Sequence, residues 1–320
     1  MKAVVLAGGY ATRLWPLTKH RPKMFLPVGN STIIEDVFEG LETDDRIDEI
    51  YVSTNECFAS EFETYLAQSG FTTPQLSVED TTEEEEKLGV IGALAQLVQR
   101  EGIDDDLFVI AGDNLISFDI SDFLTEFTER GATTIAAYNV GSRERAKSYG
   151  LVELDNDRVV GFQEKPDNPS STLVSIACYA LPAEAVAFEE YLAGGNNPDE
   201  PGWFIQWLQA RTPVFAHTFD SAWFDIGTRD SYLDAVKWTL DDTNLIAESA
   251  TVENTDIGTG VHIMPGARVV DSVVDRSVIF PETTIDGCEI RDSVIGKQAR
   301  LEDINSTGAL IGAYTEVPNQ

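Results

Sequence analysis

The clearest chemical signal lies near the start of the chain, where two glycines precede several basic residues. Gly8 and Gly9 end an apolar run with the length of a strand buried on both faces, as in a parallel sheet. Glycines at such a turn let backbone N–H groups approach phosphate oxygens closely. Arg13, Arg21 and Lys23 add fixed positive charge. The pattern predicts that this turn binds a polyphosphate.

Acidic residues avoid the same stretch. Asp and Glu outnumber Lys and Arg by 55 to 22 in the whole chain, yet the first acid is Glu35. A local excess of positive charge in so acidic a protein indicates an anionic ligand. The stretch matches neither the P-loop nor the dinucleotide-binding glycine pattern. The glycines alone would be equally compatible with a tight turn that binds nothing.

Further candidate residues follow other strands. Asp113 comes after a buried apolar run, 107–111, and a glycine. Because the carboxyl ends of parallel strands meet at one edge of a sheet, we expect Asp113 to lie close to the Gly8 turn. Glu164 and Lys165 follow a later strand, although Glu-Lys-Pro by itself is a common surface triplet.

The elements that must position these residues alternate between strand and helix. A capping box, Thr32 to Glu35, predicts a helix that ends near Glu42. The alternation predicts an α/β domain with a doubly wound, Rossmann-like, mainly parallel sheet. The expected strands are 3–7, 49–54, 76–79, 107–111, 133–140, 151–154, 158–162, 173–181 and 214–219, and the further helices are 56–68, 88–100, one ending near 192, 204–208 and 231–240.

The pattern changes beyond a predicted linker at 241–244. Aliphatic residues recur from Ile246 to Val317 at steps of five or six residues, with one double step. Such short repeats suit neither a helix nor a β meander and predict a β-helix of roughly four coils. Small residues between them, such as Ser272 and Ser293, suit inward corners. The predicted domains are 1–241 and 242–320.

Composition excludes several functional classes. The formal net charge of −33 would repel nucleic acid and anionic membranes. Acids spread along the whole chain favour life in multimolar cytoplasmic salt, where the Debye length is about 3 Å; an acidic surface for a basic partner is the competing explanation. Three scattered cysteines and three scattered histidines predict neither a disulfide framework nor structural zinc. The first apolar run is too short for a signal peptide or membrane span, so we expect a cytoplasmic protein.

The glycine turn resembles the signature of a known enzyme family. Ala7-Gly8-Gly9-Tyr10-Ala11-Thr12-Arg13-Leu14, with Pro16-Leu17-Thr18 and Pro22-Lys23, is similar to the sugar-1-phosphate nucleotidylyltransferases. The resemblance implies a nucleotidyltransferase domain followed by a left-handed parallel β-helix. The family usually has glycine where this chain has Ala11, and we expect an ordinary backbone conformation there.

Three later motifs extend the resemblance in the family's order. Asp113, and Asp225 within Trp223-Phe224-Asp225-Ile226-Gly227-Thr228, match the two aspartates that bind Mg²⁺ in the family, and two carboxylates with phosphate oxygens suit that ion. Glu164-Lys165-Pro166, downstream of Tyr149 and Gly150, matches the motif whose Glu meets sugar hydroxyls and whose Lys meets the sugar phosphate.

Base recognition is the part of the resemblance with most departures. The segment from Lys87 to Leu94 resembles the family's base-recognition segment and keeps Gly92, but Lys87, Val90 and Ile91 differ from it. The family's Asn-x-Gly is absent, and Val174 to Ala177 stands in its place.

These matches imply nucleotidyl transfer from a nucleoside triphosphate to a sugar-1-phosphate. We favour UTP with glucose-1-phosphate for glycan synthesis, with dTTP as the alternative. The expected catalytic residues are Arg13, Lys23 and Asp113; the substrate-binding residues are Leu6, Gly8, Gly9, Gly92, Tyr149, Gly150, Glu164, Lys165 and Trp223; and the Mg²⁺ ligands are Asp113 and Asp225.

Two other functions were weighed against this one. An acyltransferase would use the β-helix and a histidine, for which only His262 is available. A non-catalytic regulatory subunit would keep the same architecture. Loss of Arg13, Lys23, Asp113 or Asp225 would favour this function, but all four residues are present. The β-helix is then expected to mediate a homo-oligomer or regulation.

Overall fold

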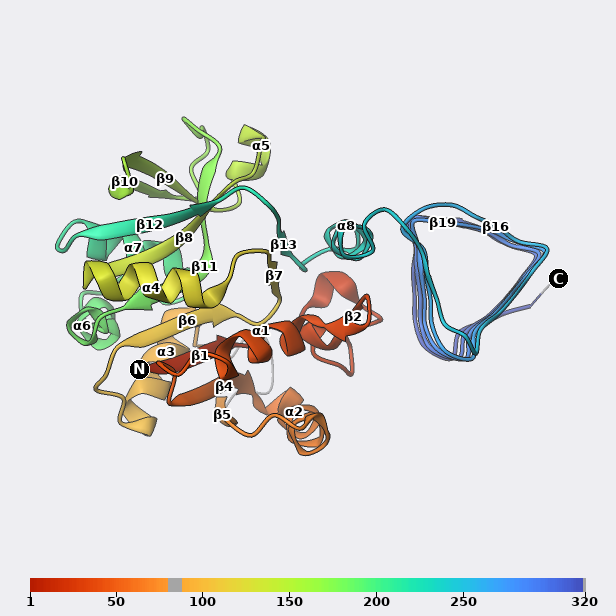
Figure 1. Cartoon of the computed structure of the whole chain (residues 1–320), viewed down its shortest axis with the longest axis horizontal. Coiled ribbons are helices and arrows are strands. Elements are labelled where there is room, and N and C mark those ends of the chain that lie inside the picture. The colour runs from red at the N-terminus through yellow and green to blue at the C-terminus, as the bar shows by residue number, and fades with distance from the viewer. Residues whose placement is uncertain (80–87, 319–320) are drawn as a thin grey trace. The chain divides into compact units, whose positions relative to one another are not determined.

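The computed structural model describes residues 1–79 and 88–318, so Lys87 and the acidic run Glu83 to Glu86 lie outside the described residues. The chain folds into two compact units. The first comprises 1–9 and 37–223, and the second comprises 10–36 and 224–320 (Figure 1). The basic part of the N-terminal stretch therefore groups with the C-terminal region. The predicted boundary at residue 241 stays a prediction, because compactness alone does not show which parts fold independently.

The first unit is built on a mixed sheet, which confirms the predicted α/β class. The apolar strands β1, β4, β5 and β6 are parallel, whereas β11 runs antiparallel to β6 and β8, and the β9–β10 hairpin lies at one edge. In the described residues its nine strands are ordered β5 (Pro74–Glu79), β4 (Glu49–Asn55), β1 (Lys2–Leu6), β6 (Leu107–Ala111), β11 (Leu173–Leu181), β8 (Thr133–Asn139), β12 (Val214–Phe219), β10 (Arg158–Glu164) and β9 (Gly150–Asp155).

Helices pack on this sheet through amphipathic faces. Leu94 and Leu97 of α3 enter the core, as its sequence pattern predicts. Contacts join α2 to β5, α3 to β4, α4 to β8 and α7 to β10, and α3, α6 and α7 pack against one another. The helices are α2 (Glu56–Ser69), α3 (Val90–Glu101), α4 (Ile120–Arg130), α5 (Arg143–Ala146), α6 (Phe188–Ala193) and α7 (Pro201–Gln209), and α1 (Ile33–Glu42) begins in the second unit.

Strand register brings the first candidate residues to one edge of the sheet. Leu6, the last residue of β1, is opposite Ala111 of β6 and Ser53 of β4. The Gly112 N–H donates to the Leu6 carbonyl at 2.9 Å. The Gly8 turn and Asp113 therefore leave neighbouring strands at the same edge, as expected.

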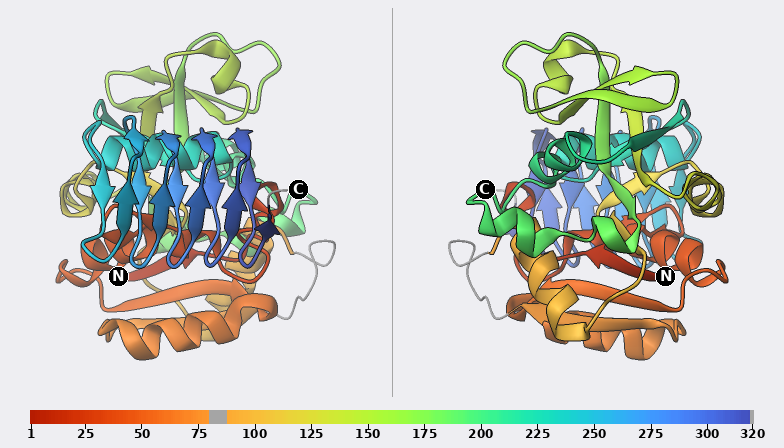
Figure 2. Two further views of the ribbon diagram at one scale, coloured as in Figure 1. Left: turned by 90° about the vertical axis from the view of Figure 1, so that its right-hand side faces the viewer. Right: turned by 90° about the vertical axis from the view of Figure 1, so that its left-hand side faces the viewer.

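The C-terminal part of the second unit is a parallel β-helix, which confirms the interpretation of the short repeats. Three parallel sheets form its faces, and Ile263, Ile279, Ile295 and Ile311 stack in successive coils (Figures 1 and 2). Its handedness stays a prediction. The sheets are β14 (Leu245–Ile246), β17 (His262–Ile263), β20 (Val278–Ile279), β23 (Val294–Ile295) and β26 (Leu310–Ile311); β15 (Thr251–Glu253), β18 (Arg268–Val270), β21 (Thr284–Asp286), β24 (Arg300–Glu302) and β27 (Glu316–Val317); and β16 (Asp256–Ile257), β19 (Val273–Asp275), β22 (Glu289–Arg291) and β25 (Asn305–Thr307).

Corner residues explain why small polar side chains recur between the aliphatic positions. Ser272, Ser277 and Ser293 are buried, and each hydroxyl donates to the backbone carbonyl two residues earlier. A buried hydroxyl is tolerated there because it satisfies a backbone acceptor at the turn. These contacts confirm the predicted inward corners.

The sequence reading missed several elements. They are α4, α5, β7 (Asn114–Ile116) and β13 (Trp223–Asp225), the last of which passes from the first unit into the second. The two short strands contain only three residues each, too few for an alternating pattern to be recognised. The second unit also contains α8 (Arg229–Thr239), the two-residue strands β2 (Pro27–Val28) and β3 (Ser31–Thr32), and single turns at Thr12–Leu14 and Lys23–Phe25.

Candidate active site

The glycine turn is held by side chains from the neighbouring strand ends. Asn55 Nδ2 donates to the Gly8 carbonyl at 2.8 Å, while Asn55 Oδ1 caps α2 by accepting from the Phe58 N–H. A Cβ atom at Gly8 would lie 3.1 Å from Oε1 of Glu79, whereas one at Gly9 would meet open space. Gly8 therefore allows the close approach of the Glu79 side chain, whereas Gly9 leaves open space at an exposed position.

Glu79 is a buried acid at this edge that sequence reasoning did not single out. It ends β5, is 8 % exposed, and accepts a hydrogen bond from Ser53 Oγ at 3.2 Å. Burial raises the pKa of its carboxyl group, which the nearby positive charge of Arg100 opposes. Its position at a strand end was the available signal, but a single Glu after an apolar run carries little information.

The basic loop lies in the second unit. Arg13 is exposed within a single turn, and Lys23 is half-buried at the start of another. Ala11, just before the first turn, has φ 50° and ψ 42°, so the expectation of an ordinary backbone conformation there was wrong. The left-handed conformation costs a residue with a Cβ atom about 1–2 kcal/mol, which is why glycine suits this position. The loop geometry overrides the preference of the alanine.

Arg21 differs from the expectation that it adds charge for a ligand. Its guanidinium carbon lies 4.9 Å from the ring centroid of Phe280, at the end of β20. Burial lowers the pKa of Arg21, and the Tyr232 side chain opposes that shift. Arg21 thus contacts the β-helix through a cation–π interaction.

Asp113 is oriented by a short hydrogen-bond network in the first unit. Asn114 Nδ2 donates to Oδ1 of Asp113 at 2.9 Å, and Trp223 Nε1 donates to Oδ1 of Asn114 at 2.6 Å. Asn114 and Trp223 are both buried. Two predicted residues are therefore connected through Asn114, whose role the sequence reading missed.

Trp223 also connects this network to Tyr149. The two rings meet edge to face, with centroids 5.0 Å apart. The Tyr149 carbonyl in turn accepts from the Lys165 N–H at 3.2 Å. Gly150 pairs with Glu164 across the β9–β10 hairpin. A chain of contacts that passes through Asn114 thus connects six predicted residues: Asp113, Tyr149, Gly150, Glu164, Lys165 and Trp223.

The Glu164 carboxylate occupies a space that two glycines leave open. A Cβ atom at Gly202 would lie 1.6 Å from Glu164 Oε2, and one at Gly150 would lie 2.8 Å from it. Burial raises the pKa of Glu164 to about 7; Glu200 adds to the rise and Lys165 opposes it. A carboxyl group with this pKa changes its charge near neutral pH.

Lys165 is held in an unusual conformation beside an acid. Its φ angle is 43°, in the left-handed region that residues with a Cβ atom rarely adopt. Its Nζ forms a salt bridge with the Glu200 carboxylate. No sequence motif singled out Glu200.

Gly92 lies in the first turn of α3, and its backbone is already engaged. The Ile91 N–H donates to the Pro198 carbonyl at 2.8 Å and the Gly92 N–H approaches the same oxygen at 3.4 Å. A Cβ atom at Gly89 would lie 2.5 Å from that oxygen. The loop before α7 therefore packs directly on the predicted base-recognition segment.

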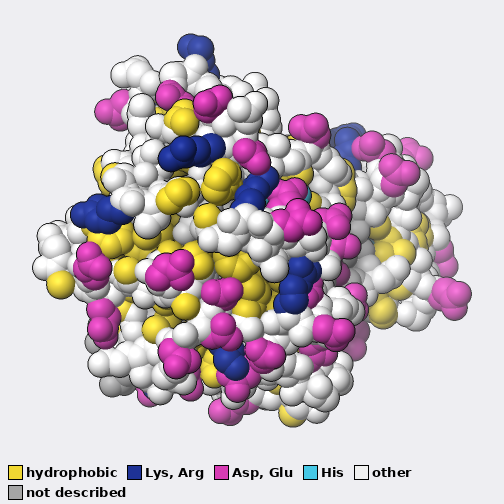
Figure 3. Space-filling model, turned by 60° about the vertical axis from the view of Figure 1, so that its left-hand side comes forward, with side chains coloured by type: hydrophobic (Ala, Val, Ile, Leu, Met, Phe, Trp, Pro, Cys, Tyr) yellow, Lys and Arg dark blue, Asp and Glu magenta, His cyan; other side chains and the backbone are white. Residues whose placement is uncertain are grey.

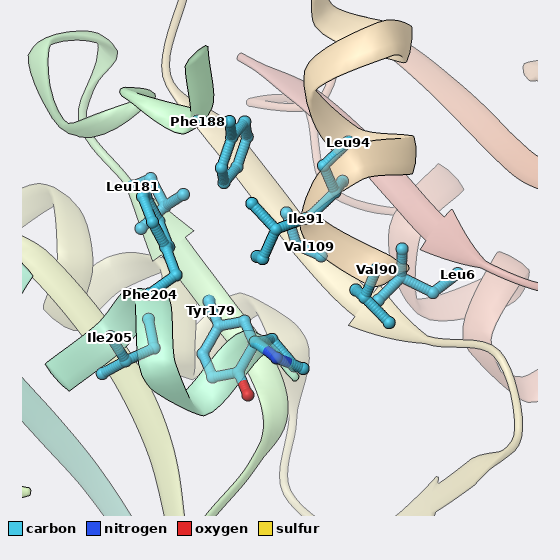
Figure 4. A pocket seen from close by; sticks show the side chains of 11 residues that line it. Leu6, Val90, Ile91, Leu94, Val109, Tyr179, Leu181, Phe188, Phe204 and Ile205 are labelled. Atoms are coloured by element: carbon cyan, nitrogen blue, oxygen red, sulfur yellow. The ribbon is translucent and has the colours of Figure 1, made fainter. Parts of the chain in front are cut away.

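Leu6 lines a small apolar pocket rather than a charged site. Its lining comes from β1, α3, β6, β11, α6 and α7, as Figure 4 shows. Among the lining residues Tyr179 alone carries a polar side-chain atom, and burial raises its pKa. Such a lining suits core packing beneath the strand ends better than binding of a phosphate. The pocket includes Leu6, Val90, Ile91, Tyr179 and Phe204.

Asp225 belongs to the second unit. Its backbone carbonyl accepts from the Gly227 N–H at 2.8 Å and from the Ser231 hydroxyl. Within residues 1–79 and 88–318 no three His, Cys, Asp or Glu side chains converge as a metal cage. A Mg²⁺ ion uses one or two carboxylates together with substrate phosphates, so the donor chemistry of Asp113 and Asp225 fits that ion.

The surface matches the acidic composition. On the face drawn in Figure 3, acidic side chains are spread widely rather than gathered in one patch. Across the part of the chain that the structure covers, no helix combines the length and apolar character needed to cross a bilayer.

The chain is similar in sequence to several known proteins. The chain is 28% identical over 315 residues to a UTP–glucose-1-phosphate uridylyltransferase of Synechocystis, covering 95% of this chain and 76% of that protein. It is 27% identical to a glucose-1-phosphate thymidylyltransferase of Streptomyces griseus, covering 99% of this chain and 93% of that protein.

A solved structure is similar over three quarters of this chain. It comes from Bacillus anthracis and is described as a glucose-1-phosphate thymidylyltransferase in complex with sucrose. The TM-score is 0.64 at 25% identity, covering 75% of this chain and 96% of that one. The family model of nucleotidyl transferases matches residues 2–242. The chain belongs to the nucleotidyl transferase family.

Proposed function

We propose that this protein transfers a nucleotidyl group from a nucleoside triphosphate to a sugar-1-phosphate and releases pyrophosphate. The observation that carries the proposal is the connected set from Asp113 through Trp223 and Tyr149 to Glu164 and Lys165. This set connects a half-buried acid and a lysine, suited to a sugar hydroxyl and a phosphate, to Asp113 through Tyr149, Trp223 and Asn114. The named activities of the relatives support the same reaction class.

The proposed reaction needs little proton transfer. A phosphomonoester has a second pKa of about 6, so a sugar-1-phosphate is largely dianionic near neutral pH. One of its oxygens attacks the α-phosphorus, a new P–O bond forms, and the bond to the β-phosphate breaks with its electron pair on pyrophosphate. The protein must position two anions and offset their charge.

The residue roles follow from the charge of the side chains and from the resemblance of their motifs to those of the family. Lys165 meets the incoming phosphate, and Glu164 accepts hydrogen bonds from sugar hydroxyls. Arg13 and Lys23 are assigned to the triphosphate and the leaving pyrophosphate. The carboxylates of Asp113 and Asp225 would hold Mg²⁺, which, when bound, offsets phosphate charge.

Within this reaction class we favour UTP and glucose-1-phosphate, in glycan synthesis, with dTTP as the alternative. A relative of each type supports these choices. A relative from Sulfolobus acidocaldarius, 29% identical over 234 residues and 61% covered by this chain, is described as a mannose-1-phosphate guanyltransferase, which makes GTP a necessary comparison. The widespread acids favour assays at high salt.

The test is pyrophosphate release from the full chain in multimolar KCl with Mg²⁺. UTP, dTTP, GTP, ATP and CTP are crossed with several sugar-1-phosphates. Turnover with one pair well above the rest supports the reaction and names the substrates. No turnover across the grid, from protein shown to be folded at that salt, refutes the proposal.

A further inference from the structure

The polar loop before α7 touches two predicted parts of the site at once. At one end its Pro198 carbonyl accepts from the Ile91 N–H at 2.8 Å, and the Asp199 carbonyl accepts from the Val90 N–H at 3.3 Å. Glu200, the next residue along the chain, forms its salt bridge with Lys165. The loop is therefore fixed by the start of α3 while it presents an acid to the lysine.

The pair between Lys165 and Glu200 is accessible. The side chains are 42 % and 34 % exposed, respectively. A pair in this range is worth only about 0.2–1 kcal/mol, because water screens it. An arriving dianion can therefore compete with Glu200 for the ammonium group.

Glu200 also acts on Glu164. Gly202, in the first turn of α7, packs directly against the Glu164 carboxylate. The Glu164 N–H donates to Oε1 of Gln206, one turn further along α7, at 3.4 Å. The titratable groups that interact with Glu164 are Glu200, Lys165, Tyr179 and Tyr191. Among them Glu200 is the acid, so its negative charge disfavours the ionised form of Glu164.

We propose that Glu200 is a further residue of the sugar-phosphate site, an internal counter-ion that holds Lys165 in the free protein and is displaced from it by the phosphate of the sugar-1-phosphate. The inference rests on the proposed function. Glu200 therefore has two opposing effects on substrate binding. Its carboxylate keeps Lys165 oriented, but Glu200 must release the ion pair and lie near a second anion when the substrate binds.

The test compares Glu200→Gln with wild type under the conditions of the substrate grid. The amide keeps the size of the side chain and removes its charge. The KM for sugar-1-phosphate should fall about two- to fivefold, which corresponds to the upper range of an exposed ion pair. The KM for the nucleotide should not change.

A matched control separates this local effect from general repulsion. Glu190→Gln, at an exposed position of α6, removes the same charge from the same unit. It should leave both KM values unchanged. An equal fall in the KM for sugar-1-phosphate in both variants would overturn the inference, because any lost acid would then suffice.

A pH profile supplies a readout that a merely structural role would not move. Removing the Glu200 charge lowers the pKa of Glu164, so the acidic limb of kcat/KM for sugar-1-phosphate should move to lower pH in Glu200→Gln. An unmoved limb, or a raised KM, overturns the inference. Active wild type with either result leaves the proposed function standing, whereas inactive wild type refutes the proposed function itself.

Discussion

The charged residues of the two units are held in different ways. In the first unit, Lys165 is paired with Glu200, and Glu164 fills a space bounded by Gly150 and Gly202. In the second unit, Arg13 stands exposed on a single turn. A sheet can orient reactive groups through its own strands and adjoining loops, whereas a loop needs support from other elements.

The β-helix and α8 provide that support for the loop. Arg21 lies over the Phe280 ring, and a Cβ atom at Gly312 would lie 2.9 Å from Cγ of Pro16. The Tyr232 hydroxyl of α8 donates to the Pro27 carbonyl at 2.7 Å. These contacts explain why residues 10–36 group with the C-terminal region.

The largest expected effect tests whether the network of the first unit carries the chemistry. Asp113→Asn keeps the size of the side chain next to Asn114 but removes the charge proposed for Mg²⁺. Turnover should fall by at least about 10²–10³-fold, the range for losing one electrostatic group, and thermal unfolding should change little. Asp225→Asn should behave in the same way. Asp122→Asn, exposed on α4, is the control, and near-wild-type activity in Asp113→Asn or Asp225→Asn would refute the metal assignment.

The second-largest expected effect tests the space that Gly202 leaves for the Glu164 carboxylate. Gly202→Ala places a Cβ atom where the carboxylate lies. This Cβ atom would displace the Glu164 carboxylate, and kcat/KM for sugar-1-phosphate should fall about 10²-fold. The KM for the nucleotide should stay unchanged. Gln209→Ala, at the end of the same helix, should affect neither constant. An equal rise in both KM values would show that Gly202→Ala disturbs more than Glu164.

A smaller effect tests the support of the loop by the β-helix. Phe280→Ala removes the ring beneath Arg21 and should lower the free energy of unfolding by about 3–5 kcal/mol. The KM for the nucleotide should rise more than that for sugar-1-phosphate, the opposite of Gly202→Ala.

Phe280→Leu separates packing from the cation–π contact. It keeps an apolar side chain but removes the aromatic face, so it should retain most of the stability and lose about 0.5–2 kcal/mol relative to wild type. Chemical denaturation and steady-state kinetics of the two variants measure both quantities. If nucleotide binding survives Phe280→Ala in folded protein, the β-helix does not position the loop.

The smallest effect concerns the backbone of the loop itself. Ala11→Gly removes the side chain from a left-handed conformation and should stabilise the protein by about 1 kcal/mol, less the entropy that glycine adds to the unfolded chain. The midpoint of thermal unfolding should rise by about one degree, because the entropy of unfolding of a chain of this length is large. A fall in the midpoint would show that the conformation is not strained.

Much of the fold followed from local patterns. The apolar runs of β1 and β6 predicted buried parallel strands, and the five- and six-residue steps predicted the β-helix because each coil must turn three corners at regular spacing. Short elements such as β7 and β13 were missed, because three residues carry too little periodicity to be recognised.

The candidate site was predictable where residue types and the order of motifs along the chain indicate its chemistry. Asp113, Glu164 and Lys165 were recognised from their motifs, whereas the contacts that connect them through Asn114, Trp223 and Tyr149 were not predicted.

Sequence by itself thus determined the fold class, the acidic surface and the reactive side chains of the first unit. Tertiary structure alone decided that Glu200 pairs with Lys165, that Gly202 makes room for Glu164, and that Ala11 adopts a left-handed conformation. Each depends on contact between segments distant in sequence or on the path of a constrained loop. Neither such contacts nor the path of the loop is encoded in the type or spacing of neighbouring residues.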